Sequence, residues 1–213
     1  MTAVVDLWNQ SLSHLGMSVT VQSETEASVQ ARVLGRFYAT CRDYVLRDFP
    51  WPCANMVVAL AEEANTTFIG WDKVYAYPAH CLAIRQICDE SGARILSRSI
   101  FTQWSEQEFL LPKIPFTLAV KDDESKTLVL TDLDPAYAMC TRALTNAALF
   151  DKGLFDSIAW RLAALAGPAL QVEKDYIGNA WNQYNACSIT NKANALNESQ
   201  QDREADSPSI SIR

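Results

Sequence analysis

The hydrophobic period of this chain changes twice, and that change most limits the folds open to it. Near the N-terminus, Val4, Trp8, Leu12 and Leu15 recur three or four residues apart. This spacing places them on one face of a helix, so the sequence predicts a helix over residues 3–15.

A capping box predicts the start of a second helix. Ser23 and Glu26 can each accept a hydrogen bond from the other's backbone N–H. We expect the helix to run to about Asp48, where Pro50 and Pro52 prevent its continuation. Its inward stripe is predicted to contain Val33, Leu34, Phe37, Tyr38, Cys41, Tyr44 and Val45.

The middle of the chain has the shorter period of strands. Residues 54–64 are expected to add a short helix, and strand patterns begin after Gly70. Strands are predicted over residues 82–88, 108–111, 116–121, 127–131 and 136–142. The polar run 122–125 predicts a hairpin turn.

The helical period then returns. Leu154, Ile158, Leu162 and Leu165 form one stripe, which Gly167-Pro168 kinks or ends. A last helix is predicted over residues 172–190. Its inward residues are expected to be Tyr176, Ala180, Tyr184 and Cys187, with Trp181 to one side, where it is a candidate for contact with a neighbouring molecule.

These patterns together predict an α+β fold. Residues 1–69 and 146–190 are expected to form an antiparallel helical bundle, and residues 70–145 a small antiparallel β unit inserted in it. Residues 191–213 are expected to form an extended C-terminal arm.

The predicted arm is mostly Asn, Gln, Ser, Asp and Glu, a composition that cannot bury enough apolar surface to fold alone. It ends in Ser209-Ile210-Ser211-Ile212-Arg213, a strict alternation typical of a strand with one apolar face. Two interpretations stay open, namely docking on another chain and a frayed terminus without function.

Composition excludes several classes. With 18 basic against 25 acidic residues the net charge is −7, which disfavours a general nucleic-acid binder. The six cysteines lack metal-site spacing, so we expect buried thiols in a reducing cytoplasm. Neither a signal peptide nor a span of ~20 apolar residues is recognisable, so a soluble intracellular product without membrane contact is expected.

Motifs for phosphate binding or for a nucleophile elbow are lacking, and no cofactor, metal site or catalytic residue is predicted. The nearest nucleophile pair is His80-Cys81, but neighbours on a strand point to opposite faces. Arg32, Arg36 and Arg47 are candidates for pairing with acidic residues of a neighbouring subunit. A solvated helix face is the alternative.

The order of short motifs along the chain resembles the head-to-tail adaptor proteins of short-tailed bacteriophages, the tail tubular protein A family. The motifs are LWNQSLSHLG at 7–16, SETEA at 23–27, CRDYVL at 41–46, FPWPCA at 49–54, WDKVYAYPAHCL at 71–82, FDKGLF at 150–155 and AWRLA at 159–163. The sequence departs from the family pattern at Pro52 and Cys53, and at His80, where the family more often has Asp.

This resemblance implies a structural protein of the virion tail or neck, assembled in the host cytoplasm and without catalytic residues. Such proteins form a ring, usually of twelve copies, under the portal protein, where they extend the channel for genomic DNA and dock the tail nozzle, a tail tubular protein B-like partner. The resemblance favours the interpretation in which the C-terminal arm docks on another chain. The tip at residues 209–213 is then the expected contact with the portal protein.

Two alternative functions stay open. The first is another neck or head-completion ring protein. The second is a cytoplasmic enzyme that uses His80 or Cys81.

Overall fold

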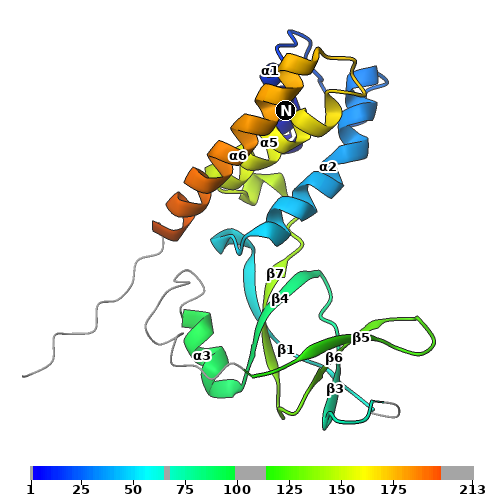
Figure 1. Cartoon of the computed structure of the whole chain (residues 1–213), viewed down its shortest axis with the longest axis vertical. Helices are drawn as coiled ribbons and strands as arrows, with labels where there is room; N and C mark the ends of the chain where they lie inside the picture. The colour runs from blue at the N-terminus through cyan, green and yellow to red at the C-terminus, as the bar shows by residue number, and fades with distance from the viewer. Residues whose placement is uncertain (1, 65–67, 99–113, 198–213) are drawn as a thin grey trace, which may run out of the picture.

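A computed structural model describes residues 2–64, 68–98 and 114–197. The fold is α+β, with a helical part at one end of an elongated molecule and a β part at the other (Figure 1). In the helical part the elements are α1 (Ala3–His14), α2 (Val29–Asp48), η1 (Pro52–Ala54), η2 (Ala147–Leu149), α5 (Lys152–Ala166) and α6 (Lys174–Asn197). In the β part they are β1 (Asn55–Ala59), β2 (Glu62–Glu63), β3 (Lys73–Ala76), β4 (Cys81–Cys88), α3 (Glu90–Arg98), β5 (Thr117–Val120), β6 (Thr127–Thr131) and β7 (Tyr137–Arg142).

Three helices begin at a residue whose side chain accepts a hydrogen bond from a backbone N–H group of the first turn. Thr2, Ser28 and Asp151 are the N-caps of α1, α2 and α5. The predicted capping box at Ser23 is therefore wrong as the start of α2. The Glu26 carboxylate instead accepts from the N–H of Gln22 at 2.7 Å, which closes a turn ahead of the helix.

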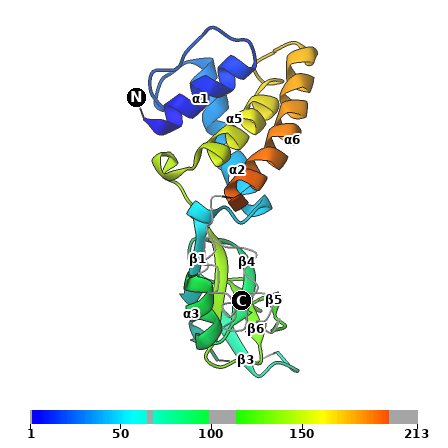
Figure 2. The ribbon, with the colours of Figure 1, turned by 90° about the vertical axis from the view of Figure 1, so that its left-hand side faces the viewer.

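Helix α5 lies at the centre of the helical part and packs against α1, α2 and α6 (Figure 2). Leu154, Ile158 and Leu162 of its predicted stripe are fully buried with Leu7 and Leu34. Burying these apolar side chains stabilises the packing of the four helices.

Two side chains from outside α2 donate hydrogen bonds to carbonyl groups at its C-terminal end. The indole N–H of the buried Trp51 donates to the carbonyl of Val45 at 2.9 Å. The Arg85 guanidinium, from β4, donates to the carbonyl of Arg47 at 2.7 Å. Both carbonyls belong to the last turn, where a helix leaves such groups unpaired.

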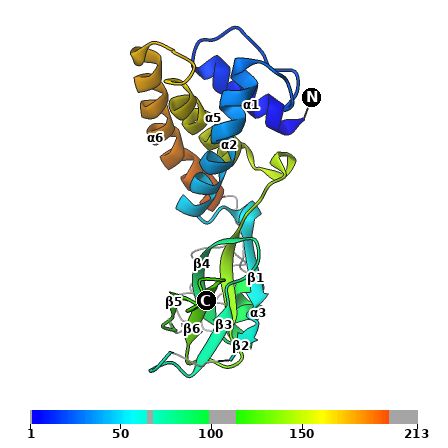
Figure 3. The ribbon, with the colours of Figure 1, turned by 90° about the vertical axis from the view of Figure 1, so that its right-hand side faces the viewer.

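The β part contains two antiparallel sheets, of strand order β1-β7-β4 and β2-β3-β6-β5. Four predicted strands are confirmed, at 82–88, 116–121, 127–131 and 136–142, and so is the hairpin that joins β5 to β6. The predicted strand at 108–111 lies outside the described residues. Figure 3 shows β1 and β7 leaving the helical part side by side, paired from Asn55 and Thr141 onward.

The predicted helix at 54–64 is wrong, because this segment is η1 followed by β1 and β2. Val57 and Val58 favour a strand, and β1 gains a partner in β7, some 80 residues further along the chain. Helix α3 was not predicted either. Its Leu96 is buried beneath Met139 of β7.

The last helix is longer than predicted and corrects the expected start of the arm. Helix α6 continues to Asn197 because Asn191 and Lys192 bond to other helices and Ala195 is buried. Tyr176 was expected to face inward but is 46% exposed. Residues 198–213, over which the rest of the arm is predicted, lie outside the described residues.

All six cysteines are free thiols. Within the described ranges, no helix combines the length and apolar character that crossing a membrane requires.

Candidate functional site

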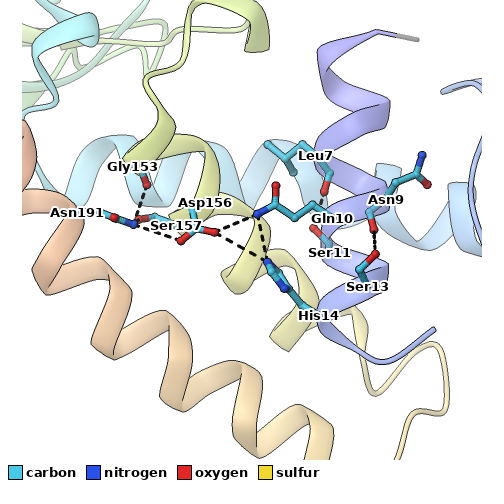
Figure 4. A network of polar contacts seen from close by, with 10 residues as sticks. All are labelled: Leu7, Asn9, Gln10, Ser11, Ser13, His14, Gly153, Asp156, Ser157 and Asn191. Carbon is cyan, nitrogen blue, oxygen red and sulfur yellow. Dashed lines mark hydrogen bonds and ion pairs between the residues drawn. The ribbon is translucent and has the colours of Figure 1, made fainter. Parts of the chain in front are cut away.

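A polar network joins α1, α5 and α6 through one carboxylate (Figure 4). The Gln10 side-chain amide donates to Asp156 Oδ1 at 3.0 Å and lies 3.4 Å from His14 Nε2. His14 Nε2 is in turn 4.0 Å from Asp156 Oδ1. Because Gln10 and His14 are one turn apart on α1, both reach the same side chain of α5.

Asn191 connects α6 to the same network. Its amide group donates to the carbonyl of Gly153 and to the hydroxyl of Ser157, each at 3.1 Å, and lies 3.5 Å from Asp156 Oδ2. Asp156 thus accepts hydrogen bonds from both flanking helices. A carboxylate held by two helices fixes their positions relative to α5.

A cleft of about 610 Å³ opens beside this network, lined among others by Lys152, Asp156, Asn191 and Asn194. His14 stacks on Trp160, with ring centroids 3.5 Å apart. Burial lowers the pKa of His14, against the opposing effect of Asp156, so the imidazole is neutral at pH 7.

The Cys187 thiol of α6 also interacts with the Asp156 carboxylate. Burial, with a smaller contribution from the Asp156 carboxylate, raises its pKa, so it stays protonated. A neutral histidine and a protonated thiol around a shared carboxylate are suited to holding three helices together. They are poorly suited to nucleophilic chemistry.

His80 and Cys81 do not meet. His80 is exposed, with a φ of 58°, just before β4 begins at Cys81. The Cys81 thiol instead contacts the Tyr77 hydroxyl at 3.4 Å. Hydrogen bonding to Cys140, and also to Tyr77, lowers the pKa of Cys81 to about 7. These contacts of the Cys81 thiol do not involve His80.

The three arginine candidates lie exposed along the outside of α2. The Arg32 side chain donates to the carbonyl of Ser28, the N-cap of its own helix, at 3.4 Å. On the same helix, Asp43 forms an ion pair with Arg42 at 2.7 Å.

The fourth interface candidate, Trp181, belongs to a cluster that the sequence did not predict. The Arg161 guanidinium of α5 lies 3.5 Å above the ring of Tyr44, and 5.6 Å and 5.3 Å from the rings of Trp181 and Tyr184. Tyr44 was expected to face the core, but it is 51% exposed and covers the arginine from outside. The cluster ties α2 and α6 to α5 by cation–π contacts.

The cluster also leaves one buried donor unused. Arg161 Nε is buried and has no hydrogen-bond partner among the described residues. A mid-helix arginine beside an apolar stripe usually predicts a solvated position, so no local signal could have identified its aromatic surroundings.

The portal-contact candidates Ser209, Ile210, Ser211, Ile212 and Arg213 lie outside the described residues. Within residues 2–64, 68–98 and 114–197, no group of three or more His, Cys, Asp or Glu side chains could hold a metal ion. No protein-family model matches this chain, and a search of curated proteins finds no match.

Proposed function

We propose that this protein is a structural head-to-tail connector of a bacteriophage virion. Copies of the chain form a ring of about twelve under the portal protein, extend the channel for genomic DNA and dock the tail nozzle. The observation that carries this proposal is the order of seven short motifs that resemble the adaptor family along nearly the whole chain.

The positions of those motif residues support the proposal. Leu12, Trp51 and Leu162, each from a different motif, are fully buried in the core that joins the helices. The resemblance therefore concerns residues on which the packing of α1, α2, α5 and α6 depends. In the proposed protein these helices form the antiparallel bundle, and residues 198–213 form the arm.

The charge of the molecule also suits the proposed role. A wall that DNA slides past should not bind phosphates, and a net charge of −7 disfavours such contacts. The elongated shape gives each copy two separate ends for partners above and below (Figure 1).

Deleting residues 207–213 tests the role of the arm. We expect at least tenfold weaker binding to portal-bearing heads in a co-sedimentation assay, because Ile210 and Ile212 would no longer reach the portal. Circular dichroism should be unchanged, because the core lies within residues 2–197.

Equal binding by the deletion variant would show that the arm does not contribute to binding the portal. Failure of the full chain to bind such heads would contradict the connector function itself. If the full chain binds, electron microscopy of the bound particles would distinguish a ring under the portal from another neck or head-completion component.

A further inference from the structure

Two cysteine thiols of the β part interact across neighbouring strands. Cys81 is the first residue of β4, and Cys140 belongs to β7, the strand that pairs with β4 (Figure 1). Their side chains are hydrogen-bonded to each other, and the Tyr77 hydroxyl lies 3.4 Å from the Cys81 sulfur. Two interacting thiols on paired strands are the arrangement from which a disulfide can form.

The register of the two strands brings the thiols together. Cys81 stands opposite Arg142, and Ile84 stands opposite Cys140. Three steps along β4 therefore match two steps along β7, so β4 bulges between these residues. A turn ends at His80, whose φ is 58°, immediately before Cys81. A bulged strand end that follows a turn has more freedom to adopt the geometry of a disulfide than the middle of a regular strand.

The two thiols differ in exposure and in acidity. Cys81 is partly exposed, whereas Cys140 is fully buried. Hydrogen bonding to Cys140, and also to Tyr77, stabilises the thiolate form of Cys81 and lowers its pKa. The same contact with Cys81, together with burial, raises the pKa of Cys140. Cys81 is therefore the thiol that a reagent in solution can reach, and it is the better nucleophile of the two.

We propose that Cys81 and Cys140 form a thiol–disulfide exchange site for low-molecular-weight disulfides such as oxidised glutathione. The Cys81 thiolate attacks one sulfur of the reagent, which breaks the S–S bond of the reagent and releases one glutathione thiol. Cys81 in the mixed disulfide carries no charge, so it no longer opposes ionisation of Cys140. Cys140 then loses its proton, attacks the Cys81 sulfur and releases the second glutathione. The two protein thiols lose two electrons and two protons, and the two glutathione sulfurs gain them.

The disulfide ties β4 to β7 and closes a loop of about 60 residues. A cross-link of this length restricts the unfolded chain more than the folded one, so the oxidised protein should resist urea better than the reduced protein. Arg85 of the same strand β4 donates to the carbonyl of Arg47 in α2. The bond therefore also fixes the strand that contacts the helical part.

The test treats the reduced full chain with oxidised glutathione at neutral pH and follows intact mass, peptide maps and the urea midpoint. The wild-type chain should lose two hydrogen atoms in mass, yield a peptide in which Cys81 is linked to Cys140, and unfold at a higher urea concentration. Cys140→Ser should stop at the mixed disulfide of Cys81 with glutathione. Cys81→Ser should lose free thiols roughly tenfold more slowly than the wild-type chain.

The matched control is Cys53→Ser. Cys53 is also partly exposed, but burial raises its pKa to about 11, so it should react slowly. A link between Cys81 and Cys140 that forms at the same rate in the wild-type chain and in Cys53→Ser would support the inference.

Three results would overturn the inference. The first is a wild-type chain that accumulates only the mixed disulfide, because Cys140 would then not reach Cys81. The second is a disulfide mapped to another pair of cysteines, or loss of thiols at the wild-type rate in Cys81→Ser. The third is an oxidised chain with a lower urea midpoint than the reduced chain, because the folded strands would then not accept the bond.

Discussion

At the scale of single residues, His14 couples the helical part to pH. Burial lowers its pKa below the ordinary value of 6.5, so the unfolded chain takes up a proton at a higher pH than the folded one. Stability that is present above pH 6.5 is therefore lost as the pH falls through that value and the folded-state pKa.

We expect the urea midpoint to fall between pH 8 and pH 5.5, and to fall less in His14→Gln, which removes the titrating ring. The exposed His80 supplies the control, because His80→Gln should follow the wild-type profile. Equal pH dependence in all three proteins would show that His14 does not couple stability to pH.

At the scale of elements, the last turns of α6 are held by contacts distant in sequence. Asn191 bonds to α5, and Lys192 pairs with Asp48 of α2 at 2.6 Å. Truncation after Thr190 should therefore lower the free energy of unfolding by about 1–3 kcal/mol, the cost of losing buried hydrogen bonds. Truncation after Asn197 should leave the urea midpoint unchanged, and equal midpoints for both truncations would contradict this account.

The sequence predicted the elements whose signals are local and missed those that depend on residues far along the chain. The stripe of Leu154, Ile158 and Leu162 is a local signal, and the structure buries all three residues. The end of α6 was missed because the partners of Asn191 lie 34–38 residues earlier in the chain, where no local pattern reveals them. Strand β1 was missed for a similar reason, since only its pairing with β7 decides between helix and strand.

The candidate site was less predictable than the fold. Trp181 was recognised as lying beside the inward stripe, but its partner Arg161 was not, because cation–π contacts between three helices leave no periodic pattern. Gln10 and His14 lie some 140 residues before Asp156 in the chain, and the packing of α1 on α5 brings them together.

At the scale of the whole molecule, Arg85 links the two parts. Its guanidinium donates to the carbonyl of Arg47 and, at 2.9 Å, to the hydroxyl of Thr141. Arg85→Met should leave the circular dichroism of the protein unchanged but separate the unfolding transitions of the two parts, weakening their coupling by about 1–3 kcal/mol. Small-angle scattering should show a broader distribution of shapes.

Arg94→Met is the matched control, because Arg94 is exposed on α3 and pairs with Glu90 in its own helix. If the two variants give the same scattering curve and the same unfolding profile, Arg85 does not hold the parts together.

The paired strands at the junction also bear on how such a chain could have arisen. Because Asn55 and Thr141 are neighbours across the ladder, the ends of the segment between them are already adjacent in space. A gene rearrangement could thus remove, enlarge or replace the whole β part at a single point of the helical scaffold. The part of the molecule most free to change over generations is then the part farthest from the helical core.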